Sequence, residues 1–126
     1  GSFEGKTAPY LLNAYVRIIS ILNQADKQHT PVLQDDFTET HERVLAIKLT
    51  QFADIVEEVS QSYEIHQLCQ YLFELAQSFH QYYENCPILK AKKNEIICHR
   101  LSLCHMTAKT IKLGMDLIGI KTINHM

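Results

Sequence analysis

Residues 93–118 read KNEIICHRLSLCHMTAKTIKLGMDLI, and this stretch decides the fold class. Apolar side chains recur in it at intervals of four and three residues, at Ile97, Leu101, Cys104, Ala108, Ile111, Met115 and Ile118. Side chains at this spacing lie on one stripe of an α-helix, and a narrow stripe is typical of a helix that packs along another. We expect a helix over residues 93–118 that Gly119 ends, followed by a short C-terminal tail.

The N-terminal part has the same periodicity. Residues 7–27 are expected to form a helix that Thr7 caps, with Pro9 in its first turn, where the missing N–H costs little. Residues 28–38 contain few periodic apolar positions and are expected to form a loop.

The middle of the chain completes the pattern. Residues 64–84 predict a helix that stops before Pro87. Residues 39–61 predict either one helix or two short ones, because residues 51–53 interrupt the apolar stripe. Together the segments predict an all-α fold, an antiparallel bundle of four to five helices with a short C-terminal tail.

Composition agrees with this fold. The chain has 126 residues, 46% of them hydrophobic, which suits one domain or a piece of a larger protein. Glycine and proline are scarce, at 4 and 3 residues, which favours long helices.

No apolar run approaches the ~20 residues that span a membrane. Four cysteines without a C-x-x-C motif favour a reduced, cytoplasmic protein. Residues 1–4 are interpreted as a linker or expression remnant.

Charge is distributed unevenly along the chain. Residues 30–87 hold ten acidic and two basic residues, whereas residues 88–126 hold seven basic and two acidic ones. The carboxylates at 35–58 are spread as on a solvated helix face. The C-terminal segment, at +5, could face a polyanion. Its cations do not share one stripe, since Arg100 and Lys112 fall on opposite sides of the apolar seam. We therefore expect these cations to make few contacts with the backbone of a polyanion, and we expect its binding to be weak.

Two kinds of chemistry find little support in the sequence. Cys98, His99, Cys104 and His105 form a repeated Cys-His pair, but helical spacing does not direct four ligands to one point, so no zinc site is expected. The glycines are isolated, so no phosphate-binding loop is expected. A cysteine with a histidine close in space stays open as a nucleophile, although no family-specific setting surrounds any cysteine. No catalytic residue is assigned.

Tyr83 has two interpretations. Its position on the apolar stripe of residues 64–84 favours a core tyrosine. Its place at a helix end, beside a loop and a basic segment, would suit stacking on an unpaired base.

Three motifs resemble one family. Residues 5–18 read GKTAPYLLNAYVRI, residues 68–89 read LCQYLFELAQSFHQYYENCPIL, and residues 99–126 read HRLSLCHMTAKTIKLGMDLIGIKTINHM. In order and spacing they resemble the C-terminal, DALR-type anticodon-binding domain of bacterial arginyl-tRNA synthetases. The resemblance covers residues 5–126 and implies an all-α bundle that binds the anticodon stem-loop of arginine tRNA, whose central base is cytosine.

The resemblance also implies a larger parent protein. That parent would be a monomeric, cytoplasmic class I arginine–tRNA ligase that uses ATP with magnesium. The catalytic domain, a partner of this one in the parent chain, is absent from these residues, and no cofactor is expected in the domain itself.

The family's RNA contacts correspond to four positions here. The resemblance implies Arg17 and Tyr83 as anticodon contacts, and it reverses the preference for a core Tyr83. Asn13 stands where family members often have tyrosine, which leaves a hydrogen bond in place of stacking. Met126 matches the terminal methionine, and His125 replaces the usual arginine before it, so one cationic contact is either missing or pH-dependent. Two alternatives remain: a stand-alone helical module that assists a tRNA-modifying partner, and a purely structural bundle.

Overall fold

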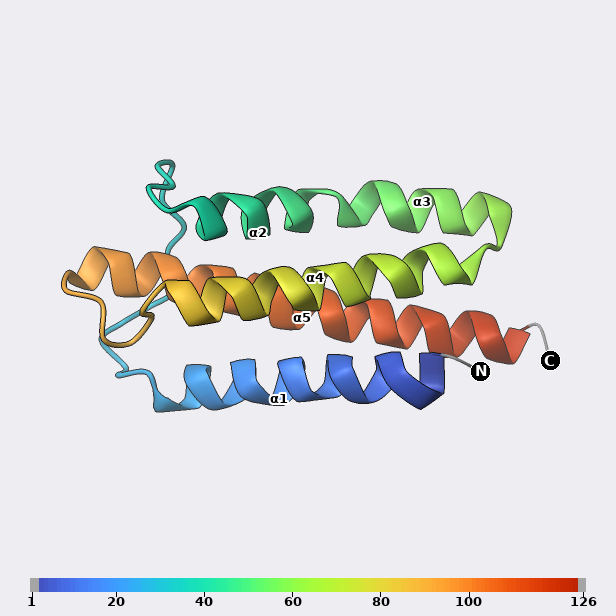
Figure 1. Ribbon diagram of the computed structural model, residues 1–126, viewed down its shortest axis with the longest axis horizontal. Helices are drawn as coiled ribbons and strands as arrows, with labels where there is room; N and C mark the ends of the chain where they lie inside the picture. The colour runs from blue at the N-terminus through green and yellow to red at the C-terminus, as the bar shows by residue number, and fades with distance from the viewer. Residues whose placement is uncertain (1–2, 125–126) are drawn as a thin grey trace.

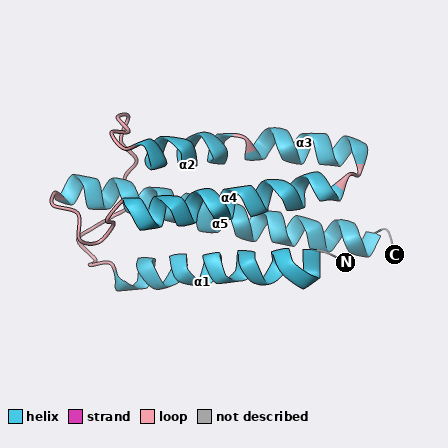
Figure 2. Cartoon of the chain, in the orientation of Figure 1, coloured by secondary structure: helices cyan, strands magenta, loops and turns pink. Residues whose placement is uncertain are grey.

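The structure is a computed structural model that describes residues 3–124. In this range a turn of π-helix, Phe3–Thr7, leads into five α-helices (Figure 1). Their bounds are α1 Ala8–Gln24, α2 Thr40–Thr50, α3 Phe52–Ser62, α4 Ile65–Asn85 and α5 Asn94–Asn124. Figure 2 shows helices and loops, and no strand, over these residues. The expected all-α fold is confirmed.

The helices form three layers. α4 and α5 lie side by side in the centre, with α1 on one side and the α2–α3 pair on the other (Figure 1). α5 runs antiparallel to both α1 and α4, and α2 and α3 run antiparallel to α4. The antiparallel bundle is therefore confirmed. No helix within residues 3–124 is long and apolar enough to cross a lipid bilayer.

The apolar seam of α5 packs as expected. Ile97, Leu101, Cys104, Ala108, Ile111 and Ile118 are buried, and Met115 is half-buried against the same core. The seam is continuous because α5 contacts α1 along one flank and α4 along the other. A helix buried on two flanks needs apolar residues at every turn, which is the pattern the sequence has.

The expected end of α5 is wrong. The helix continues past Gly119 to Asn124, so the tail predicted from residue 120 onward is helical at least that far. Gly119 does not adopt a positive φ, and none of the described glycines does. Glycine permits the left-handed conformation that ends many helices but does not impose it. Residues 125 and 126 lie outside the described residues.

The expected cap of α1 is also wrong. Thr7 makes no side-chain capping hydrogen bond, because the preceding π-helical turn gives its backbone a helical conformation, with φ −76° and ψ −43°. A residue in that conformation cannot serve as the extended N-cap that a threonine side chain completes. Pro9 does lie in the first turn, as predicted.

Residues 39–61 form two helices. α2 ends at Thr50 and α3 begins at Phe52, with Gln51 between them. The Gln51 N–H donates to the Lys48 carbonyl at 3.2 Å, a tighter turn than an α-helix makes. At the start of α2, Glu39 and Glu42 form a reciprocal capping box.

Candidate nucleic-acid interface

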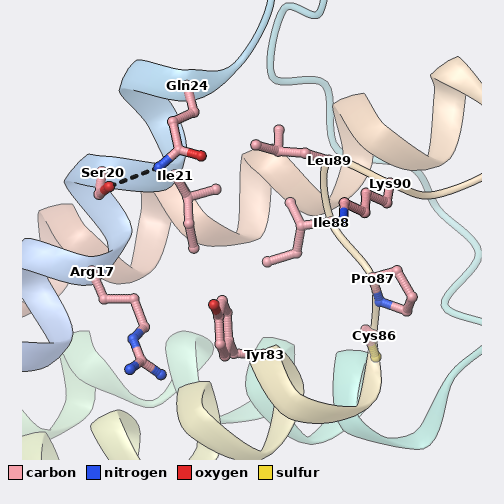
Figure 3. Close-up of a pocket in the computed structure, with 10 residues that line it drawn as sticks. All are labelled: Arg17, Ser20, Ile21, Gln24, Tyr83, Cys86, Pro87, Ile88, Leu89 and Lys90. Atoms are coloured by element: carbon pink, nitrogen blue, oxygen red, sulfur yellow. Dashed lines mark hydrogen bonds between the residues drawn. The ribbon is translucent and has the colours of Figure 1, made fainter.

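A pocket of about 470 Å³ lies between α1 and the end of α4. The loop from α4 to α5 closes one side of it (Figure 3). Its lining residues are Arg17, Ser20, Ile21, Gln24, Tyr83, Cys86, Pro87, Ile88, Leu89 and Lys90. The lining contains two cations and no carboxylate. The pocket is therefore suited to an anionic, partly apolar ligand.

Tyr83 points into this pocket, whereas Tyr82 belongs to the core. The Tyr83 side chain is 40% exposed and that of Tyr82 is fully buried. The Tyr82 hydroxyl donates a hydrogen bond to the Arg100 carbonyl at 2.9 Å. The apolar stripe of α4 thus passes through Tyr82, and the spacing argument that placed Tyr83 on it is wrong by one residue.

Arg17 and Tyr83 meet across the pocket. Arg17 lies on the exposed face of α1, as its position opposite the apolar stripe predicted. Its guanidinium carbon is 4.6 Å from the centre of the Tyr83 ring, a cation–π contact. Figure 3 shows the arginine extending from α1 toward that ring, with Ile21 and Ile88 pointing toward each other beside it. The arrangement presents a stacked cation and aromatic ring beside an apolar surface.

An aromatic cluster continues along the seam between α1 and α4. The Tyr10 ring centre is 4.9 Å from that of Phe73 and 5.3 Å from that of His80. Burial lowers the pKa of His80, and the Arg17 charge lowers it further, which keeps the imidazole neutral near pH 7. Sequence reasoning missed Tyr10 and His80. Tyr10 could have been found, because Tyr10, Asn13 and Arg17 are spaced to lie on one helix face.

The four RNA contacts implied by the resemblance differ in their placement. The structure brings Arg17 and Tyr83 together. Asn13 is exposed on α1, one turn before Arg17, and does not line the pocket. Met126 lies outside the described residues. α5 carries its last described residues to the end of the bundle where α1 begins (Figure 1).

Arg100 and Glu42 are both buried, although the carboxylates around Glu42 were expected to lie on a solvated helix face. Arg100 is 7% and Glu42 is 2% exposed. The Arg100 Nε donates to Glu42 Oε2 at 2.7 Å, and its Nη1 donates to the Pro87 carbonyl at 2.5 Å. Buried charges of opposite sign persist when each is paired and hydrogen-bonded, as here. One cation of the basic C-terminal segment is therefore unavailable to a polyanion.

The repeated Cys-His pair does not gather at one point. His99 and Cys104 are buried, while His105 is exposed. The described residues contain no group of three or more His, Cys, Asp or Glu side chains that could hold a metal ion. Burial raises the pKa of the Cys104 thiol to about 12, and burial also raises the pKa of the Cys86 thiol. Both cysteines are protonated and unsuited to nucleophilic attack at neutral pH.

Comparison with known sequences assigns the chain to a family. Residues 11–126 match the family described as DALR anticodon binding domain. The Arginine--tRNA ligase of Proteus mirabilis (strain HI4320) is 43% identical over 126 residues, covering 99% of this chain and 22% of the relative. That of Haemophilus influenzae (strain 86-028NP) is 48% identical over 127 residues, with the same coverage of each chain. The chain thus spans about a fifth of the length of these curated relatives.

Two solved structures have the same fold. The arginyl-tRNA synthetase of Thermus thermophilus aligns with a TM-score of 0.80 and 35% identity, over 93% of this chain and 21% of that chain. The arginyl-tRNA synthetase of Plasmodium falciparum aligns with a TM-score of 0.74 and 30% identity, with the same coverage.

Proposed function

The chain belongs to the DALR anticodon-binding family, and from this membership we propose that it holds the anticodon stem-loop of arginine tRNA as a domain of an arginine–tRNA ligase. The observation that carries the proposal is the contact of Arg17 with the exposed ring of Tyr83, in an open pocket without a carboxylate. Unpaired bases of an RNA loop stack on aromatic rings and on guanidinium planes.

The geometry suggests a role for each part of the pocket. Arg17 covers the Tyr83 ring, so a splayed base can stack on the outer face of the guanidinium and extend the stack. Ser20 and Gln24 supply donors and acceptors for a base edge, and the Gln24 amide already donates to the Ser20 hydroxyl at 2.9 Å. Lys90, on the opposite wall, suits a phosphate.

Asn13 and Met126 complete the proposed contact set. Asn13 shares the exposed face of α1 with Arg17 and could hydrogen-bond a neighbouring nucleotide. Met126, which lies outside the described residues, would contribute a thioether and a terminal carboxylate. We take residues 5–126 as the extent of this RNA-binding domain.

The chemistry of aminoacylation would belong to the rest of the parent enzyme. Within the described residues there is no glycine-rich phosphate loop and no group of side chains that could hold a metal ion. These residues do not fit ATP or magnesium, so both would be held by the catalytic domain. We propose a monomeric, cytoplasmic parent. No observation favours the stand-alone module or the purely structural bundle.

The test is a titration of the chain with two RNA hairpins. One is the anticodon stem-loop of an arginine tRNA, and the other is the same hairpin with guanine in place of the central cytosine. The proposal expects tighter binding of the first, because the pocket would hold the central base. A chain lacking Met126 should bind the first hairpin more weakly at an unchanged Tm. Equal affinity for both hairpins would contradict anticodon recognition.

A further inference from the structure

The loop that closes the pocket has few backbone hydrogen bonds. Residues 86–93 connect α4 to α5, and residues 86–90 supply one wall of the pocket. Ile88 anchors this wall in the core, and residues 89–90 form a turn, but among the described residues no backbone–backbone hydrogen bond of good geometry links residues 87–92 to a helix. A hydrogen bond to this segment from a helix would therefore add to the anchor at Ile88.

The Arg100 guanidinium supplies that contact from inside the core. Its Nη1 donates to the Pro87 carbonyl at 2.5 Å, while its Nε donates to the buried Glu42 carboxylate at 2.7 Å. Glu42 belongs to α2 and Arg100 to α5, so the position of the guanidinium is fixed by two helices. The Arg100 carbonyl also accepts from the Tyr82 hydroxyl, one residue before Tyr83 in the pocket.

A buried ion pair is a weak source of stability, because removing two charges from water offsets much of their attraction. Its geometry is more distinctive than its energy. The planar guanidinium directs separate N–H groups at a carboxylate and at a carbonyl, which a lysine ammonium at the same position cannot reach in the same way.

We propose that Arg100 is a positioning residue for RNA binding: through the Pro87 carbonyl it fixes the wall of residues 87–90 against Tyr83, with Glu42 holding the guanidinium in place. Arg100 is 7% exposed and does not line the pocket, so its effect on RNA passes through the loop. This inference rests on the proposed function, since it assigns the pocket to RNA.

The first experiment compares Arg100→Lys with Val59→Ala. Val59 is buried in α3 and does not line the pocket, so its truncation lowers stability without touching the wall. Both variants are melted, and both are titrated with the arginine anticodon hairpin well below their Tm. We expect Arg100→Lys to raise the Kd about tenfold, as a loosened binding wall would, and Val59→Ala to leave it unchanged. An unchanged Kd for Arg100→Lys, or an equal loss in both variants, would overturn the proposal.

The second experiment does not depend on RNA. NMR backbone order parameters of residues 88–90 in the free protein should be lower in Arg100→Lys than in the wild-type chain and in Val59→Ala. If the wild-type chain fails to bind the hairpin, the proposed function fails, and these order parameters still test the positioning of the loop. Equal order parameters at residues 88–90 in all three proteins would refute the positioning role.

Discussion

Two consecutive tyrosines near the end of α4 have opposite surroundings. Tyr82 is fully buried and hydrogen-bonded to the Arg100 carbonyl, while Tyr83 is 40% exposed under the Arg17 guanidinium. Consecutive residues of a helix point about 100° apart, so one can belong to the core and the next to a binding surface. Substituting each tyrosine in turn therefore separates an effect on stability from an effect on RNA binding.

We predict that Tyr83→Ala weakens hairpin binding by about 1–3 kcal/mol, the range for loss of a stacked aromatic ring. Its Tm should change little, because the ring is exposed. Tyr82→Ala should instead cost about 3–5 kcal/mol of unfolding free energy, as for other buried aromatics. Thermal melts and hairpin titrations of both variants measure the two effects. A large loss of Tm in Tyr83→Ala with unchanged binding would place Tyr83 in the core and remove it from the site.

His99 makes stability depend on pH. The Gln34 N–H donates to its Nδ1 at 3.0 Å, so the neutral ring carries its proton on Nε2. Burial lowers the pKa of His99, and Arg100 adds to this while Glu42 opposes it. The folded state therefore resists protonation, and the unfolded state takes up a proton below its ordinary pKa of about 6.5. Stability from this residue is present above that pH and is lost as pH falls below it.

We predict a falling Tm between pH 7 and pH 5, measured by thermal melts. His99→Gln should lower the Tm at pH 7 and reduce this pH dependence, since one of the groups behind it is gone while His80, whose pKa burial also lowers, remains. His66→Gln, at an exposed position of α4, is the matched substitution control. If the slope of Tm against pH is unchanged in His99→Gln, the acid sensitivity belongs to another group.

At the scale of elements, α4 and α5 approach closely where Gly114 faces Leu72. A Cβ built at residue 114 would lie 2.6 Å from Leu72 Cδ1, and Leu72 is fully buried and cannot move aside freely. Gly119, one turn and a residue later in the same helix, has nothing within 4 Å of its Cβ position. The first glycine is required by packing, and the second is not.

We predict opposite effects for the same substitution at the two glycines. Gly114→Ala should destabilise the chain by about 1–2 kcal/mol, because overpacking exceeds the gain in helix propensity. Gly119→Ala should stabilise it by about 0.5–1 kcal/mol through helix propensity alone. Chemical denaturation of both variants measures the difference. A stabilising Gly114→Ala would mean that the two helices are not in contact there.

The sequence predicted elements better than their ends. Apolar periodicity gave α5 and its seam, because burial on two flanks requires an apolar residue at each turn. The end at Gly119 was wrong, since a glycine costs a helix only about 1 kcal/mol and does not impose an end. The cap at Thr7 was wrong because the chain is already helical before it. A capping threonine or a helix-ending glycine is a local signal, and it does not show what the rest of the chain does at that position.

At the scale of the whole molecule, the pocket joins parts that are distant in sequence. Motif resemblance indicated Arg17 and Tyr83 separately, but their contact depends on how α1 packs beside α4. No feature of the neighbouring sequence predicted that Lys90 lines the pocket or that Arg100 is buried. The partner of Arg100 is Glu42, 58 residues away, and a single sequence does not reveal such pairings.

We predict weak binding that depends on salt. Arg17 and Lys90 line the pocket, and Arg100 is withdrawn into the core, so few phosphates can be contacted. With two to four contacts, the logarithm of the association constant should fall with the logarithm of salt concentration at a slope of roughly −1.5 to −3. Hairpin titrations at two or more salt concentrations measure it. A slope near zero would mean that phosphates contribute nothing.

The most direct test of the central claim, that the Arg17–Tyr83 pocket holds the anticodon loop, is chemical-shift mapping of the labelled chain during titration with the arginine anticodon hairpin. We predict that the perturbed amides cluster on α1 from Asn13 to Gln24 and on residues 83–90. The α5 side of the neighbouring groove, at His105, Lys109 and Lys112, should be unaffected. Perturbation of these α5 residues with an unchanged pocket would contradict the account.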